Sequence, residues 1–272
     1  MIGSAGTFQL MRVVLLSCLS ISCIYGQDSA PNPKPTNGFN QSSLPDAQAL
    51  LDSYFSTTRD FNAAQSLSLV GEVTLKNLPL KGKLTMYTEK GGKLYRVIDF
   101  PPVGKIEAGS DGTVAWERNF TSAARILPKD ETQQNFFGLD PAIAESWKTQ
   151  FRLETIGNET VDGKSCFAVR MIPIGVGRPI TIWLDAATGL LVKSVAIVHR
   201  SDGDIAVTQI LRDYRDENGM TVPHKFEIVS EPPMQIDLQE IKINVELPQD
   251  VFKLPDDVRA LAARQSTDQP AK

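Results

Sequence analysis

The sequence has few of the residues from which catalytic and metal sites are built. A chain of 272 residues contains two histidines, His199 and His224, and three cysteines. The histidines are far apart, no carboxylates are spaced with them as metal ligands, and the chain has no HExxH, CxxC, GxSxG or Walker-type motif. Cys166 has no local partner that would make it a nucleophile. We therefore expect no catalytic residue, no metal site and no cofactor, and a protein that is not an enzyme.

Excess positive charge and long apolar runs are also missing. The formal net charge is −4 at pH 7 and no basic stripe is present, which argues against a nucleic-acid partner. No apolar run reaches the roughly 18 residues that a transmembrane helix needs.

The N-terminal residues have the pattern of a secretory signal. Arg12 precedes an apolar stretch that ends on the small residue Gly26. This pattern predicts cleavage before Gln27, so residues 1–26 are assigned to a signal peptide. We expect an exported, periplasmic protein.

An alternative fate for the N-terminus is lipidation. Leu15-Leu16-Ser17-Cys18 resembles the lipobox of bacterial lipoproteins, which would anchor the chain in the outer membrane through Cys18. The apolar region before Ser17 is short, so ordinary cleavage is favoured over lipidation. With ordinary cleavage, Cys166 would be the single cysteine left, and the exported chain would contain no disulfide.

A leader and an amphipathic helix follow the signal. Residues 27–44 are rich in Pro, Asn, Ser and Gln and hold almost nothing large and apolar, which is typical of a flexible segment. Pro45 and Asp46 suit the first turn of a helix. Apolar residues then recur at helical spacing: Ala47, Leu50, Leu51, Tyr54 and Phe55. This stripe must pack on another part of the fold.

Alternation of apolar and polar residues dominates the chain from residue 66 to residue 245. This period of two predicts antiparallel strands with one apolar face, joined by tight turns. Asp111-Gly112 favours a type I′ hairpin. The expected strands cover residues 67–76, 83–89, 93–100, 104–110, 113–118, 151–159, 164–173, 179–185, 190–199, 204–213, 221–230 and 234–245.

Two irregularities interrupt this pattern. Between Thr121 and Gln150 the alternation stops, and an N-cap pair, Asp140-Pro141, predicts a second helix over 141–150. In the last strand the apolar phase changes near Gln239, which predicts a bulge.

The pattern fits one domain. We assign residues 45–258 to it and residues 259–272 to a C-terminal tail.

The order of several turn and strand motifs resembles that of the LolA-like superfamily, the periplasmic outer-membrane lipoprotein carriers and their lipoprotein-sorting relatives. The motifs are Leu44-Pro45-Asp46-Ala47-Gln48-Ala49-Leu50-Leu51, Ser110-Asp111-Gly112-Thr113-Val114-Ala115-Trp116, Val161-Asp162-Gly163-Lys164-Ser165-Cys166-Phe167, Ile182-Trp183-Leu184-Asp185-Ala186-Ala187-Thr188-Gly189-Leu190-Leu191, Asp213-Tyr214-Arg215, Gly219-Met220-Thr221-Val222-Pro223-His224 and Leu247-Pro248-Gln249-Asp250-Val251-Phe252. The resemblance implies an α+β, mainly β fold: a strongly curved antiparallel sheet, or incomplete β-barrel, with helices covering its concave face.

The resemblance also implies a function. It predicts a non-enzymatic protein that binds the acyl chains of a lipid or lipoprotein and carries them toward the outer membrane. The alternative is an envelope sensor or interaction module of the same fold that binds a membrane or a membrane-associated protein without shuttling lipid. Carriers of this superfamily use an arginine near the cavity to hold the lid closed, and here Arg96, Arg118 and Arg125 all lie in that region.

The candidate lining of the ligand site consists of large apolar residues from the strands and from the interrupting segment. They are Leu69, Val73, Leu84, Met86, Trp116, Phe136, Phe137, Trp147 and Trp183.

Overall fold

The computed structural model describes residues 44–58, 64–128, 149, 151–175, 178–200, 203–229 and 232–267. The expected signal peptide, nearly all of the leader and most of the predicted helix at 141–150 lie outside these residues. Within the described residues, no helix is long and apolar enough to span a membrane.

The described residues form one open sheet of thirteen antiparallel strands and two helices. The elements are α1 (Ala47–Thr57), β1 (Ser66–Leu75), β2 (Leu80–Glu89), β3 (Lys93–Phe100), β4 (Gly104–Asp111), β5 (Ala115–Asn119), β6 (Ser122–Ile126), β7 (Phe151–Val161), β8 (Lys164–Pro173), β9 (Ile180–Asp185), β10 (Leu191–Arg200), β11 (Gly203–Glu217), β12 (Met220–Val229), β13 (Met234–Ile243) and α5 (Asp256–Thr267).

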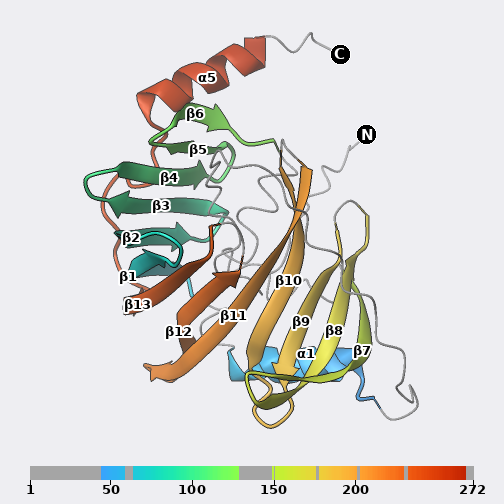
Figure 1. The fold of residues 1–272 in the computed structure, drawn as a ribbon. Coiled ribbons are helices and arrows are strands. Elements are labelled where there is room, and N and C mark those ends of the chain that lie inside the picture. Colours follow the sequence, from blue (N-terminus) through green and yellow to red (C-terminus); the bar gives the residue numbers. More distant parts are fainter. Residues whose placement is uncertain are drawn as a thin grey trace, which may run out of the picture.

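The sheet consists of two meanders joined by one long-range pairing. Its strand order is β6-β5-β4-β3-β2-β1-β13-β12-β11-β10-β9-β8-β7, so β1 pairs with β13 and every other neighbour is also adjacent in the chain. The two halves of the sheet stand at a steep angle to each other in Figure 1, which shows the strong curvature. The predicted fold class, a curved antiparallel sheet that does not close, is confirmed.

Helix α1 packs on one face of this sheet, which we call the inner face. The Asp46 carboxylate caps the helix by accepting from the Ala49 N–H at 2.9 Å. Leu51, Tyr54 and Phe55 are buried in one cluster with apolar residues of the strands. The Thr155 hydroxyl donates to the Pro45 carbonyl at 2.8 Å and fixes the start of the helix against β7. The predicted apolar stripe is therefore the surface that α1 buries.

Two hairpins have the two-residue turns that the sequence suggests, and one does not. Asp162-Gly163 and Asn218-Gly219 each have positive φ at both positions, as a type I′ turn requires. The prediction of a type I′ turn at Asp111-Gly112 is wrong. The Asp111 side chain accepts from the N–H groups of Thr113 and Val114, both at 2.8 Å, and this stabilises a longer connection before β5.

The bulge predicted in the last strand is confirmed. Val70 pairs with Glu240 and Gly71 pairs with Leu238, so Gln239 is the extra residue on β13. The same β1 position needs glycine, because a Cβ on Gly71 would lie 2.6 Å from the Asp237 carbonyl oxygen. The bulge and this glycine let the two meanders join at the β1–β13 pairing.

Two elements differ from the sequence prediction. Ser122–Ile126 forms the edge strand β6, although no strand was expected there. Residues 256–267, most of which were assigned to the tail, form α5, which packs beside β6 at the end of the sheet (Figure 1).

Burial of tyrosines against the inner face predicts a loss of stability at alkaline pH. Burial raises the pKa of Tyr54 to about 12, from 10.0. Between these values the unfolded chain loses the Tyr54 proton while the folded chain keeps it, so the free energy of unfolding falls as pH rises. Tyr54→Phe should remove about 2 kcal/mol of this fall by about pH 11.5.

Urea unfolding of both proteins near neutral pH and at the alkaline pH measures the difference. Tyr87→Phe, at a half-buried position on the other face, is the control. If the free energy of unfolding depends equally on pH in the wild type and in Tyr54→Phe, the raised pKa of Tyr54 is contradicted.

Candidate functional site

The inner face is one continuous apolar surface. Four of the predicted lining residues lie on it, and each is at most 1% exposed: Leu69, Val73, Leu84 and Met86. They come from β1 and β2, where Leu69 pairs with Met86. The same buried cluster continues through β13 and β12 to β8 and β9, where Met171 and Ile182 belong to it. The alternation of apolar residues therefore places these four predicted residues together.

The two described tryptophans of the prediction lie on the opposite, outer face. Trp183 belongs to a separate buried cluster with Cys166, Ala168 and Val192, while its strand neighbours Ile182 and Leu184 face inward. The prediction that Trp183 belongs to the concave lining is corrected, because the alternation of β9 turns its side chain outward. Thr181 and Asp185 share the outward phase with Trp183, while Ile180, Ile182 and Leu184 form the inward phase.

Trp116 is also turned outward. It pairs with Gly109, and an added Cβ on that glycine would lie within 2.9 Å of the indole ring. The Arg118 guanidinium lies 5.4 Å from the centre of the Trp116 ring, and the Tyr95 ring centre lies 6.5 Å from it. The indole thus packs over the missing side chain of Gly109 on the outer face. Phe136, Phe137 and Trp147 lie outside the described residues.

Several polar side chains are buried on the inner face. Gln209 is 1% exposed and lies on β11 between Val207 and Leu211, which both belong to the apolar cluster. Its cross-strand neighbour Ser194 on β10 is also 1% exposed. Among the described residues, no group donates to or accepts from the Gln209 carboxamide. A buried carboxamide without hydrogen bonds costs about 1–3 kcal/mol, so such groups are rare in folded proteins.

The structure separates the three arginines that the sequence could not. Arg96 is 4% exposed and lies on the inner face, paired across strands with Met86 and Ala108. Arg118 faces outward, where its Nε donates to Glu107 at 2.7 Å. Arg125, on the edge strand β6, donates to Glu117 at 2.8 Å. Arg96 is the one of the three that is buried against the apolar inner face.

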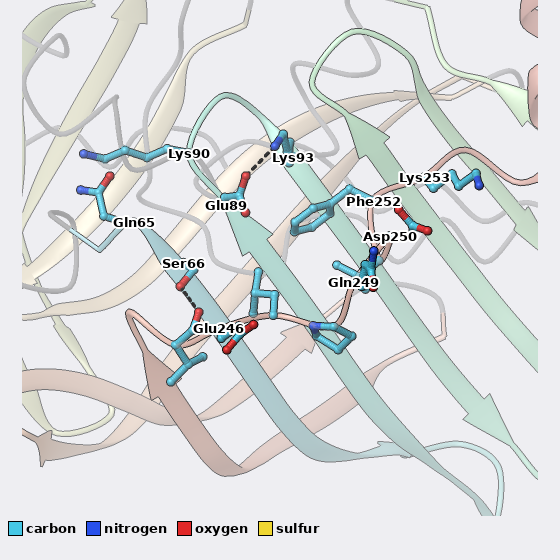
Figure 2. Close-up of a pocket in the computed structure, with 14 residues that line it drawn as sticks. Gln65, Ser66, Glu89, Lys90, Lys93, Glu246, Gln249, Asp250, Phe252 and Lys253 are labelled. Atoms are coloured by element: carbon cyan, nitrogen blue, oxygen red, sulfur yellow. Dashed lines mark hydrogen bonds and ion pairs between the residues drawn. The ribbon is translucent and has the colours of Figure 1, made fainter.

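A groove of about 810 Å³ on the outer face is lined by many polar and charged side chains. Residues 245–253 follow β13 and cross β1, β2 and β3, and Figure 2 shows this crossing segment over the strands. The Ser66 hydroxyl donates to the Val245 carbonyl at 2.7 Å, and Lys93 pairs with Glu89. The Lys93 ammonium also lies 5.9 Å from the centre of the Phe252 ring. The contacts of Ser66 with Val245 and of Lys93 with Phe252 hold the crossing segment to the sheet.

His224 has a structural environment. It is 3% exposed, its Nδ1 lies 3.1 Å from the Leu238 carbonyl oxygen, and its Nε2 lies 2.9 Å from Glu217 Oε1. These contacts tie β12 to β13 and to the end of β11. The His199 side chain lies outside the described part of the structure.

Three solved structures are similar to this chain over most of its length. A DUF1329 family protein from Desulfovibrio piger is 14% identical, with 76% of this chain and 97% of that one covered and a TM-score of 0.53. A LolA superfamily protein from Nitrosomonas europaea is 12% identical, with coverage of 78% and 99% and a TM-score of 0.53. The fold is LolA-like.

A domain from Vibrio parahaemolyticus assigned to outer-membrane lipoprotein sorting is 14% identical, covers 76% of this chain and 97% of its own length, and has a TM-score of 0.52. At these identities the likeness establishes the fold alone. No protein-family model matches the sequence, and no match was found among curated proteins. The resemblance seen in the order of the motifs is confirmed at the level of the LolA-like fold.

Sequence reasoning missed Gln209 and Ser194, although the signal was present. Val207, Gln209 and Leu211 alternate in one strand, so a polar side chain stands at a position whose neighbours in phase are apolar. The same holds for Ser194 beside Ala196. A search for polar residues in the buried phase of a strand would have found both.

The burial of Cys166 predicts an unreactive thiol. The side chain is 0% exposed and burial raises the pKa of its thiol, so little thiolate is present and reagents cannot reach it. In a chain that starts at Gln27, where Cys166 is the single cysteine, we expect no reaction with a disulfide reagent in the native state and full reaction in guanidinium chloride. Rapid native-state labelling would contradict the burial of Cys166.

Proposed function

We propose that this protein binds the acyl chains of a lipid or lipoprotein against the inner face of its sheet, without catalysis. The observation that carries the proposal is the extent of the apolar inner face, which continues across both meanders. Among the described residues, the eleven-residue α1 is the one helix that packs on it. A sheet with one apolar face needs a cover, and an acyl chain supplies about 0.8 kcal/mol for each CH₂ group that it removes from water.

The buried polar groups suit an amphiphile better than a pure hydrocarbon. A carboxamide can donate to an ester or amide carbonyl and can accept from an amide N–H or a hydroxyl. These are the groups that join acyl chains to glycerol or to a protein. Gln209 thus offers a hydrogen-bonding position within an apolar surface, as small-molecule sites commonly do. Arg96 adds a buried cation on the same face.

The proposal includes export to the periplasm and a role in moving acyl chains toward the outer membrane. The support is the signal pattern of residues 1–26 and the LolA-like fold. The alternative, a sensor or interaction module, uses the same fold without a stoichiometric lipid.

Lipid analysis of the purified protein separates these two functions. We expect the mature protein, isolated from its native envelope without detergent, to release about one equivalent of acyl lipid on extraction and mass spectrometry. The stripped protein should then take up a pyrene-labelled fatty acid. A lipid-free protein that takes up no probe would overturn acyl binding and favour the interaction module.

A single substitution tests the role of Gln209. Gln209→Leu replaces the polar carboxamide side chain with an apolar side chain of similar size. Because it removes an unpaired buried polar group, the lipid-free variant should be as stable as the wild type or more stable, by up to about 3 kcal/mol. Its affinity for an acyl amide or acyl ester probe should fall about tenfold, which corresponds to the loss of about 1.4 kcal/mol from one hydrogen bond.

Gln235→Leu is the matched control, because Gln235 lies on the outward phase of β13 and donates to Asp237 at 2.8 Å. Binding should be unchanged in this variant. Equal probe affinities in Gln209→Leu and in the wild type would remove Gln209 from the site while leaving acyl binding itself intact.

A further inference from the structure

The large hydrophobic side chains that stay exposed are unevenly distributed. Six are exposed among the described residues: Leu78, Val103, Phe120, Ile156, Ile174 and Val229. Ile156 lies within β7, while the other five lie in or at strand connections. These connections are β1–β2, β3–β4, β5–β6, β8–β9 and β12–β13. In an antiparallel meander successive connections alternate between the two ends of the sheet, so all five lie at the same end.

Four of these residues form a row along that end, which we call the apolar rim: Leu78, Val103, Phe120 and Val229. They are 42–52% exposed. The Lys76 N–H donates to the Pro233 carbonyl at 2.8 Å, which joins the β1–β2 turn to the loop after Val229. An added Cβ on Gly104 would lie 2.7 Å from the Phe120 Cβ, so Phe120 sits on the β3–β4 turn. The β1–β2 turn thus adjoins the β12–β13 loop, and Phe120 adjoins the β3–β4 turn.

The connections at the other end of the sheet have the opposite character. They include Lys90-Gly91-Gly92, Asp111-Gly112-Thr113, Asp162-Gly163 and Asn218-Gly219. None of the exposed large hydrophobic residues belongs to them. Isolated exposed hydrophobic residues are normal on protein surfaces. Their confinement to one end, against polar turns at the other, marks the apolar rim as a surface with a partner.

Three lysines lie beside the apolar rim, each in an ion pair with a carboxylate. Lys76, Lys81 and Lys105 lie within a few residues of its turns, and their side chains are 37%, 66% and 57% exposed. Glu227, Glu72 and Asp99 are their ion-pair partners on the neighbouring strands. Surface pairs of this kind are weak, so these ammonium groups can exchange partners with an external anion.

We propose that the apolar rim docks on the surface of a lipid bilayer that contains anionic head groups. Turns on alternate strands are about 10 Å apart, so the rim presents separate apolar tips rather than one packed patch. A bilayer interface accepts such tips without shape complementarity, and nearby lysines bind lipid phosphates. A protein partner would instead need a contiguous, well-packed contact. The inference does not depend on acyl binding, because a sensor could use the same rim.

Vesicle co-sedimentation tests the proposal. The wild type should bind vesicles of phosphatidylcholine with about one third phosphatidylglycerol, and bind less to pure phosphatidylcholine. The variant Leu78→Ser/Val103→Ser/Phe120→Ser should bind at least about tenfold more weakly, because three apolar tips no longer enter the interface. Its thermal unfolding should stay close to that of the wild type, since all three positions are exposed in turns.

Ile156→Ser is the matched control, because Ile156 is exposed (38%) but lies within β7 and not in a strand connection. It should bind vesicles as the wild type does. Lys81→Gln/Lys105→Gln should weaken binding to the anionic vesicles and leave binding to pure phosphatidylcholine unchanged. Absence of wild-type binding to the anionic vesicles, or equal loss in the rim variant and in Ile156→Ser, would overturn the proposal.

Discussion

The pairing of β1 with β13 is the interaction on which the rest of the fold depends. It joins two meanders that otherwise have no strand in common, and it runs along nearly the whole length of both strands. Without it, the apolar phase of β1 and β2 would end at an open edge. With it, the cluster around Leu69 and Met86 becomes continuous with the cluster around Met171 and Ile182. The extra residue Gln239 and the missing side chain of Gly71 allow the two strands to pair at their most irregular point.

The two faces of the sheet have different roles because their chemistry differs. The inner face is apolar and carries a few buried polar side chains, of which Gln209 is the clearest. The outer face is held by paired charges and by aromatic rings stacked with cations, such as Lys193 over Trp183 at 4.1 Å. The segment after β13 adds to this outer layer and ends in α5, where Arg118 donates to Asp257 at 3.3 Å. The polar and ionic contacts that hold the fold together thus lie mainly on the outer face, and the inner face is mainly apolar.

Much of this architecture could be predicted from residue order, and the failures have local physical causes. The period-two alternation predicts nearly every strand, and the change of phase near Gln239 predicts the bulge. The edge strand β6 was missed because Ser122–Ile126 is short and mostly exposed, so it has little apolar alternation. Helix α5 was missed because its burial rests largely on Val258, which is 0% exposed.

The candidate site was only partly predictable. Leu69, Val73, Leu84 and Met86 lie on the inner face, as the period-two alternation of β1 and β2 predicts, and their contact with a ligand stays a prediction. Trp116 and Trp183 were misplaced because size was taken as a sign of inward orientation. In β5 the small Ala115 faces inward instead, and Gly109 makes room for the indole outside.

The β1–β13 pairing also constrains how the chain acquires its structure. Leu67 and Ile243 are partners across almost the whole domain, so the first strand waits for the last before its second edge is covered. Closing so long a loop is slow, and the unfinished meander exposes both an apolar face and a strand edge in the meantime. A chain of this topology reaches its native state only after its C-terminal part is available.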